Sequence, residues 1–276
     1  MGKKMHEWTR KSVTASMAVV MAFGLTPALP MTALADESPS VASASQEALA
    51  IGVSSEENLI AAVDSAASGT LISLEGDIEL SKVLTIPEGK NIILDLAGHT
   101  LSVPKAPAGS SLYAIHNYGT LLIKDSSEGS GAIESRGVQN NGNLTLESGS
   151  IVSFDSNGGG AAVWNKGDFL MTGGSLSFVG EKSGNGAGAP LNNQAGAFAE
   201  ISGGELLSPY TCIFSSGDLK VSDIQLQSST DFWMTVKLYA DGLAEFNNVT
   251  IKTTNGGCVE NAGGNAVLKT VVSSRL

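Results

Sequence analysis

A segment that recurs about every 25 residues constrains the fold of this chain more than any other feature. The unit reads apolar-x-Asn-x-Gly-x-apolar-x-apolar, with a further apolar residue five positions later, and Ser215 and Ala240 replace the asparagine in two copies. A unit this short cannot bury its apolar side chains alone, so successive copies must stack on one another. The copies in clear register begin at Ile115, Val138, Val163, Ile213 and Leu238, a looser copy runs from Leu191 to Ile201, and another begins at Val259.

Apolar and polar residues alternate within each copy, as they do along a half-buried β-strand. The alternation begins at Thr70, and it predicts strands of three to five residues with turns between them. Since the copies lack a helical stretch, leucine-rich and ankyrin repeats are disfavoured. We therefore predict an all-β parallel solenoid over residues 70–276, with eight or nine coils in which each strand pairs with its equivalent in the next coil.

Stacking of the coils would align equivalent residues in columns. The inward columns that we expect are Ile115, Val138, Val163, Ile213 and Leu238, and then Leu121, Leu144, Phe169 and Leu219. The amides of a third column are expected to hydrogen-bond to one another in a ladder of Asn117, Asn140, Asn165 and Asn261. The glycine two residues after each asparagine is expected to adopt a backbone φ angle that other residues resist.

The first 35 residues have the pattern of a secretory signal peptide. Four basic residues before position 12 precede an apolar stretch over residues 13–25, and Ala33-Leu34-Ala35 provides the small residues of a cleavage site. Because the apolar stretch is too short to span a bilayer, we predict export, with no membrane insertion of the mature chain. The long basic region is typical of export signals in Gram-positive bacteria.

Residues 36–55 are rich in serine and alanine without periodicity, which is typical of a flexible linker. In residues 56–69, apolar side chains recur at helical spacing as far as Gly69. We predict a short capping α-helix there, which would cover the first coil and shield its strand edge. The expected domains are a signal peptide (1–35), a linker (36–55), a capping helix (56–69) and the solenoid (70–276).

Two segments resemble recurring motifs of a known group. Asp95-Leu96-Ala97-Gly98-His99-Thr100-Leu101 is similar to the LDLNGHTL segment of bacterial secreted and cell-surface right-handed parallel β-helix proteins, with Ala97 in place of the usual asparagine. Ile123-Lys124-Asp125-Ser126-Ser127 followed by Gly131-Ala132-Ile133 resembles their I-K-D-S-S…G-x-I coil. The likeness covers roughly residues 56–276, and it implies a right-handed coil and export. Pectate lyases, polygalacturonases and adhesins share this pectate-lyase-like fold, so it implies no single activity.

The residues that polysaccharide cleavage requires are not marked in the sequence. A lyase of this fold needs carboxylates that hold Ca²⁺ and a basic residue, but Arg136 and Lys237 have no distinguishing context. A hydrolase needs two facing carboxylates, and Gly98-His99-Thr100 lacks the second glycine of the polygalacturonase motif. We therefore assign no catalytic residue, no metal site and no cofactor, and we keep a polysaccharide lyase or glycoside hydrolase as an alternative.

The charge balance limits the class of partner. The formal net charge of −11 becomes −14 once residues 1–35, with their four Lys and Arg and one Glu, are removed. Nucleic acid binding requires a basic surface, and no such surface is visible in the sequence, so we expect no nucleic-acid partner. The same negative charge disfavours acidic polysaccharides as ligands.

Cys212 and Cys258 each precede the first inward residue of their copy, with Lys237 in the equivalent place on the coil between them. Two coils would separate the cysteines by about 9.6 Å, since neighbouring strands lie about 4.8 Å apart. This separation exceeds the reach of a disulfide. We therefore predict that the two thiols are not bonded to each other.

An outward column is the candidate binding surface. It follows the inward residues by one position, with Trp233 beside it, and contains His116, Gln139, Trp164, Phe214 and Tyr239. Aromatic faces along one side of a solenoid can stack on sugar rings. The alternative interpretation, which the sequence favours, is that these rings pack beneath the longer loops around residues 177–190 and 227–235.

These features together predict an exported, non-enzymatic protein, secreted or at the cell surface, that binds glycans or host or neighbouring proteins as adhesins do. The alternatives are the polysaccharide-cleaving enzyme named above and a structural stalk or spacer. The segment from Val271 to Leu276 has no capping element, so we expect a truncated gene product, a partner that covers the exposed strand edges, or self-association through them.

Overall fold

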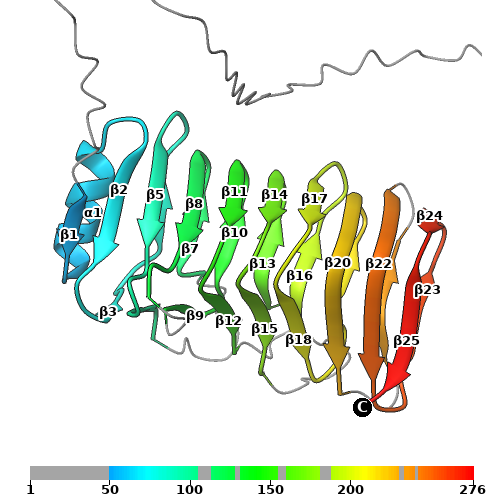
Figure 1. Ribbon diagram of the computed structural model, residues 1–276. Helices are drawn as coiled ribbons and strands as arrows, with labels where there is room; N and C mark the ends of the chain where they lie inside the picture. The colour runs from blue at the N-terminus through cyan, green and yellow to red at the C-terminus, as the bar shows by residue number, and fades with distance from the viewer. Residues whose placement is uncertain are drawn as a thin grey trace, which may run out of the picture. The chain divides into compact units, whose positions relative to one another are not determined.

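The computed structural model describes residues 50–104, 113–127, 131–154, 160–180, 188–229, 233–239 and 242–276. These residues form a parallel β-solenoid of about nine turns with one short helix (Figure 1). The predicted all-β parallel solenoid is therefore confirmed. Its right-handed coil stays a prediction, which the known preference of parallel crossovers supports. The predicted signal peptide (1–35) lies outside the described residues.

The strands of each turn lie on three walls. The first wall is an eight-stranded parallel sheet made of β4 (Leu84–Ile86), β7 (Ile115–Asn117), β10 (Val138–Asn140), β13 (Ala161–Asn165), β16 (Ala189–Asn193), β19 (Ile213–Ser215), β21 (Met234–Leu238) and β23 (Gly257–Asn261). The other two walls form one larger sheet, because the long strands β20 (Asp218–Ser228) and β22 (Leu243–Thr253) run along both of them.

The first halves of β20 and β22 belong to the second wall, whose other strands are β1 (Ile51–Val53), β2 (Thr70–Leu74), β5 (Asn91–Asp95), β8 (Thr120–Lys124), β11 (Asn143–Leu146), β14 (Asp168–Met171), β17 (Phe198–Ile201) and β24 (Asn265–Leu268). Their second halves belong to the third wall, whose other strands are β3 (Ile78–Glu79), β6 (Thr100–Ser102), β9 (Ala132–Ser135), β12 (Ser150–Ser153), β15 (Ser175–Phe178), β18 (Glu205–Ser208) and β25 (Val271–Arg275).

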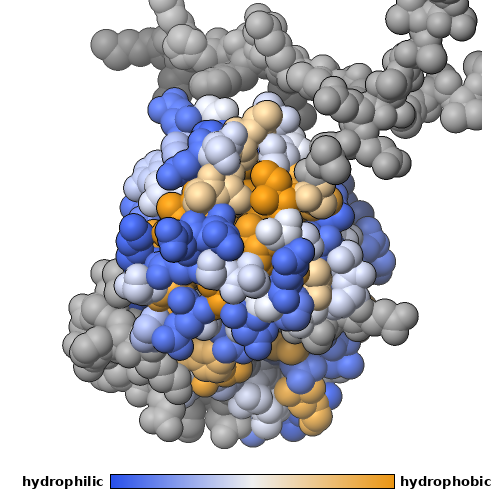
Figure 2. Space-filling model, turned by 90° about the vertical axis from the view of Figure 1, so that its left-hand side faces the viewer, coloured by the Kyte–Doolittle hydropathy of each residue, from blue (hydrophilic) through white to orange (hydrophobic). Residues whose placement is uncertain are grey.

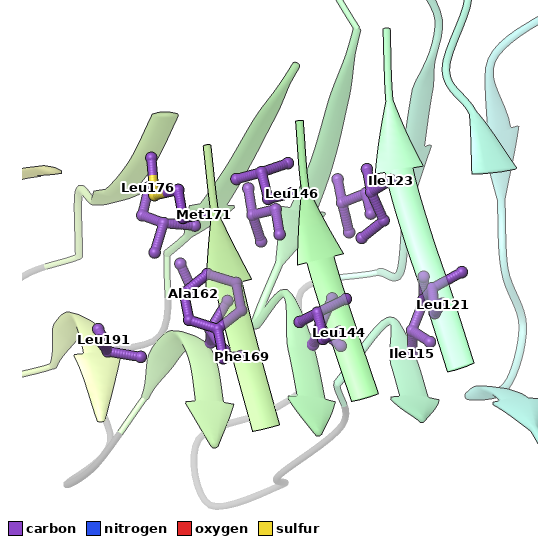
Figure 3. Close-up of a cluster of buried hydrophobic side chains, with 14 of the residues drawn as sticks. Ile115, Leu121, Ile123, Leu144, Leu146, Ala162, Phe169, Met171, Leu176 and Leu191 are labelled. Atoms are coloured by element: carbon purple, nitrogen blue, oxygen red, sulfur yellow. The ribbon is translucent and has the colours of Figure 1, made fainter. Parts of the chain in front are cut away.

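The inward side chains of the three walls form one continuous apolar core (Figure 3). Leu121, Leu144 and Phe169 follow one another in register on β8, β11 and β14, and each is 1% exposed. Equivalent residues therefore lie directly over one another, and each coil buries its apolar side chains against the coils on both sides.

One predicted inward column is wrong at its last member. The column that begins at Ile115 stacks as expected through Ile213, but Val236 rather than Leu238 pairs with Ile213. Leu238 instead pairs with Ser215 and places an apolar side chain in the asparagine column. The error is a shift of two residues, which keeps the same side chains inward, so strand alternation alone does not reveal it.

Helix α1 (Glu56–Ser65) closes the N-terminal end of the solenoid (Figure 1). Its N-cap residue Ser55 accepts a hydrogen bond from the backbone N–H of Asn58, and Leu59 and Val63 are buried in the core. Viewed from this end, the surface is largely hydrophilic around smaller hydrophobic areas (Figure 2). Within the described ranges, no helix has the length and the hydropathy that a membrane span requires.

The described end of the predicted linker is not a linker. Residues 51–53 form strand β1, which pairs in parallel with β2, and Val53 is buried in the core. The solenoid therefore begins before α1, and the helix follows directly on its first strand. The serine- and alanine-rich composition hides this strand because only three residues carry it.

A ladder of buried asparagines joins the coils at the turn between the first and second walls. Each amide Nδ2 donates a hydrogen bond to the Oδ1 of the next asparagine over 2.7 to 2.9 Å, in the order Asn117, Asn140, Asn165 and Asn193. Each of the first three amides also donates to backbone carbonyls of the stacked turns. The predicted ladder therefore exists from Asn117 to Asn165, and the structure adds Asn193.

The ladder ends before Asn261, contrary to the prediction. Asn193 donates to the hydroxyl of Ser215, and the next place in the column is occupied by Leu238. Asn261 lies beyond this interruption, where it is exposed and bonds to the backbone of Gly263 and Gly264 in its own turn. An apolar side chain neither donates nor accepts a hydrogen bond, so Leu238 interrupts the ladder.

The glycines that follow the ladder are required by close packing rather than by their φ angles. A Cβ atom on Gly142 would lie 2.2 Å from the carbonyl oxygen of Gly119 in the preceding coil, and one on Gly167 would lie 2.2 Å from that of Gly142. None of these three glycines has a positive φ, whereas Gly263, two residues after Asn261, has a φ of 127°. The predicted φ, which other residues resist, is therefore confirmed at Gly263 and wrong at Gly119, Gly142 and Gly167, where the stacked turns approach too closely for any side chain.

Candidate ligand-binding surface

The outward side of the eight-stranded sheet carries one side chain per coil in a line, which we call the outer row. Parallel pairing keeps its members in register, so neighbours lie about 4.8 Å apart. From His116 to Lys237 the residues before and after each member are buried, while the members themselves are half-buried. The outer row consists of Thr85, His116, Gln139, Trp164, Asn192, Phe214, Lys237 and Glu260.

The predicted column contains Tyr239 where the structure has Lys237. This placement is wrong because of the two-residue shift at Leu238. Tyr239 lies just after β21 and is 43% exposed, and its ring centroid lies 6.4 Å from that of Phe214 at an interplanar angle of 32°. Tyr239 therefore flanks the outer row without being a member of it.

Trp233 contacts the outer row near its C-terminal end. The Lys237 Nζ atom lies 5.3 Å from the centroid of the Trp233 ring and 3.1 Å from Glu260 Oε2. The ammonium group is therefore engaged by a cation–π contact and an ion pair. These contacts end the uncharged part of the row at Phe214.

His116 is packed near two tyrosines. The ring centroids of Tyr113 and Tyr118 lie 6.0 and 6.5 Å from its own, the second at an interplanar angle of 88°. Burial, together with the positive charge of Lys166, holds the pKa of His116 below its usual value. The imidazole is therefore neutral at pH 7. Its Nε2 atom is buried without a hydrogen-bond partner.

Trp164 has an amide side chain on either side. Gln139 and Asn192 are its register partners on β10 and β16. The Oδ1 atom of Asn192 accepts a hydrogen bond from Gln194 Nε2, which orients the Asn192 amide. This part of the row combines an indole face with amide donors and acceptors, and such a combination suits a polar ligand that has apolar faces.

Sequence reasoning missed the contribution of β16 to the row and to the ladder. The copy at Leu191 carries extra residues before its equivalent turn, which blur the spacing to the next glycine. The signal that could have found it is the match of Leu191-Asn192-Asn193 to the apolar-x-Asn start of the repeat. That match places Asn192 in the outer row and Asn193 in the ladder.

The two motifs that resemble other β-helix proteins build a turn. The carboxylate of Asp125 is buried and accepts hydrogen bonds from the backbone N–H groups of Gly98 and Gly131, both over 2.8 Å. Burial alone would raise the pKa of Asp125, but these bonds and those from Ser127 outweigh it and hold the pKa below its usual value. In the described ranges, three or more His, Cys, Asp or Glu side chains nowhere gather as metal ligands would.

The cysteines are free, as predicted. Cys212 is buried, its Sγ donates to the carbonyl oxygen of Gln227 at 3.2 Å, and burial raises the pKa of its thiol. The residue in the equivalent place on the coil between Cys212 and Cys258 is Thr235, not Lys237, because of the same two-residue shift. The two thiols remain two coils apart in either register.

Comparisons of this chain with protein-family models, with curated proteins and with solved structures find no match. The function is therefore inferred from the chemistry of the outer row.

Proposed function

We propose that this chain is an exported, non-enzymatic, adhesin-like protein that binds glycans through the outer row. The observation that carries the proposal is the line of His116, Trp164 and Phe214, interleaved with amide side chains on one parallel sheet. An aromatic face covers the C–H side of a sugar ring, and amides exchange hydrogen bonds with its hydroxyl groups. Tyr239 and Trp233 would bound the site at its C-terminal end.

The place of action follows from the N-terminal sequence. The basic region, the short apolar stretch and the Ala33-Leu34-Ala35 site support secretion, to the medium or the cell surface, in a bacterium of the Gram-positive type. The negative net charge supports a neutral ligand over nucleic acid or an acidic polysaccharide.

The outer row also bears on the alternative functions. A stalk or spacer needs a soluble surface and gains nothing from aromatic side chains in line, so the row favours binding. A lyase or hydrolase would cleave its ligand, and release of unsaturated or reducing ends from a polysaccharide panel would support that alternative. Host or neighbouring proteins are the second class of partner. Binding of such a protein that does not depend on glycans would support that alternative.

A glycan array tests the proposal with one variant and one matched control. Trp164→Ala removes the central ring, while Leu170→Ala removes an exposed apolar side chain from β14, on a different wall. We expect the wild-type chain to bind at least one class of neutral glycan. Trp164→Ala should weaken that binding at least tenfold, and Leu170→Ala should leave it unchanged. Absence of glycan binding, or full binding by Trp164→Ala, would contradict the proposal.

A further inference from the structure

Rings and amides alternate along the outer row, one per coil. The order over five consecutive strands is ring, amide, ring, amide, ring, from His116 through Gln139, Trp164 and Asn192 to Phe214. The sequence pattern missed this alternation because Asn192 lies in the loosest copy of the repeat. Equivalent groups therefore recur every second coil, at a spacing of about 9.6 Å.

A two-coil period matches a particular class of ligand. In a flat β-1,4-linked glycan, successive sugars are turned over relative to each other, so the same face recurs once per disaccharide. The length of such a disaccharide is comparable with the two-coil spacing. A ring on every second coil can then stack on every second sugar, and the amides between can bond to the sugars between.

The electrostatics of the row suit an uncharged chain. His116 is neutral at pH 7 because its pKa is lowered by burial and by Lys166. Beyond Phe214 the alternation stops at Lys237, whose ammonium pairs with Glu260 and lies over Trp233. The alternating part thus spans four strand spacings, about 19 Å, which is about the distance from the first sugar to the fifth in such a chain.

We propose that the outer row binds a linear, neutral, β-1,4-linked glycan that runs along the solenoid axis, across the strands, with a pentasaccharide in contact. This inference rests on the proposed glycan binding and adds the direction, linkage geometry and length of the ligand. His116, Trp164 and Phe214 stack on alternate sugars, and Gln139 and Asn192 hydrogen-bond to the sugars between them.

Calorimetric titration with two oligosaccharide series tests the inference, using cellobiose, cellopentaose and cellohexaose, and the corresponding chitin oligosaccharides. In at least one series, we expect the pentasaccharide to bind at least tenfold more tightly than the disaccharide and the hexasaccharide to add less than threefold. The double variant Gln139→Trp/Trp164→Gln keeps the composition of the row but breaks its two-coil period. It should lose at least tenfold in pentasaccharide affinity while its disaccharide affinity changes less than threefold, with an unchanged circular dichroism spectrum.

The outcomes separate this inference from the proposed function. If the pentasaccharide binds no more tightly than the disaccharide, or if the exchanged variant binds it as well as the wild type, the alternating site is wrong while glycan binding stands. If a glycan array finds ligands for the wild type but neither β-1,4 series binds, the linkage assignment is overturned. If no glycan of any class binds, the proposed function fails and this inference with it.

Discussion

A middle coil and the coil of β23 use the same repeat positions in different surroundings. Asn165 is fully buried, and its amide hydrogen-bonds to the asparagines of both neighbouring coils. Asn261 occupies the same column but is exposed and bonds to its own turn. Phe246 and Leu268 differ in the same way, since they pair in register on β22 and β24 but are 0% and 52% exposed.

This difference shows that the neighbouring coils, more than the residue itself, determine what a repeat position contributes. In a solenoid each unit contacts its nearest neighbours, so a side chain with coils on both sides gains twice the contact of one with a coil on one side. At the N-terminal end, α1 takes the place of a further coil. Within the described chain, no element packs beyond β23, β24 and β25.

The largest expected effect is on the free energy of unfolding, from truncation of the apolar pair Phe246 and Leu268. Phe246→Ala should lower the free energy of unfolding by about 3 to 5 kcal/mol, because it leaves a cavity between two coils. Leu268→Ala should lower it by less than about 1 kcal/mol, because its side chain is half exposed already. Urea unfolding followed by circular dichroism measures both, and equal losses would contradict the comparison.

The asparagine pair should give the next largest difference. Asn165→Ala removes a buried amide together with its hydrogen bonds to Asn140 and Asn193, so we expect a loss of about 2 to 3 kcal/mol. Asn261→Ala removes two exposed hydrogen bonds and should cost less than about 1 kcal/mol. The same unfolding measurement applies, and a larger loss for Asn261→Ala would break the comparison.

The exposed coil also carries the prediction of self-association. Val272 and Leu268 are 56% and 52% exposed on β25 and β24, next to free strand edges. If these edges pair with a second copy, light scattering should show the wild-type chain as a dimer or larger species. Leu268→Lys should shift it toward monomer with little change in stability, since inward charge disfavours edge pairing. A wild-type chain that is monomeric at high concentration would make the prediction wrong.

The smallest effect is the pH dependence of stability that His116, a half-buried member of the outer row, contributes. The pKa of His116 in the folded chain is below its usual value of 6.5, so the unfolded chain takes up the proton more readily. Stability should therefore fall as the pH drops below about 6.5. His116→Gln, which introduces the side chain found at position 139, should reduce the fall in melting temperature between pH 7 and pH 5. An unchanged pH dependence would contradict this role.

The fold follows from the sequence because the same position of the repeat carries a similar residue in several copies. Ile115, Val138 and Val163 occupy one such position, and Asn117 and Asn140 occupy another. The pattern fails where the strand alternation permits two registers, as at Val236 and Leu238. It also fails for the backbone distance that excludes a side chain at Gly142, since that distance exists only between stacked turns.

The candidate site was predictable in part for the same reason. Trp164 and Phe214 follow from the repeat, because they come directly after inward residues of clear copies. Asn192 and Lys237 do not follow, since one lies in a copy with extra residues and the other in a shifted copy. The alternation of rings and amides therefore becomes visible only once the pairing register is known.

Glycan binding at the middle coils is tested most directly by the indole N–H signals of Trp164 and Trp233 in a ¹H–¹⁵N spectrum, assigned with Trp→Phe variants. On titration with cellopentaose or chitopentaose, the Trp164 signal should shift saturably, because its ring lies within the alternating part of the row. The Trp233 signal should shift much less, because its ring is held by Lys237 beyond that part. A Trp164 signal that stays in place while either pentasaccharide binds would contradict the assignment of the outer row as the binding surface.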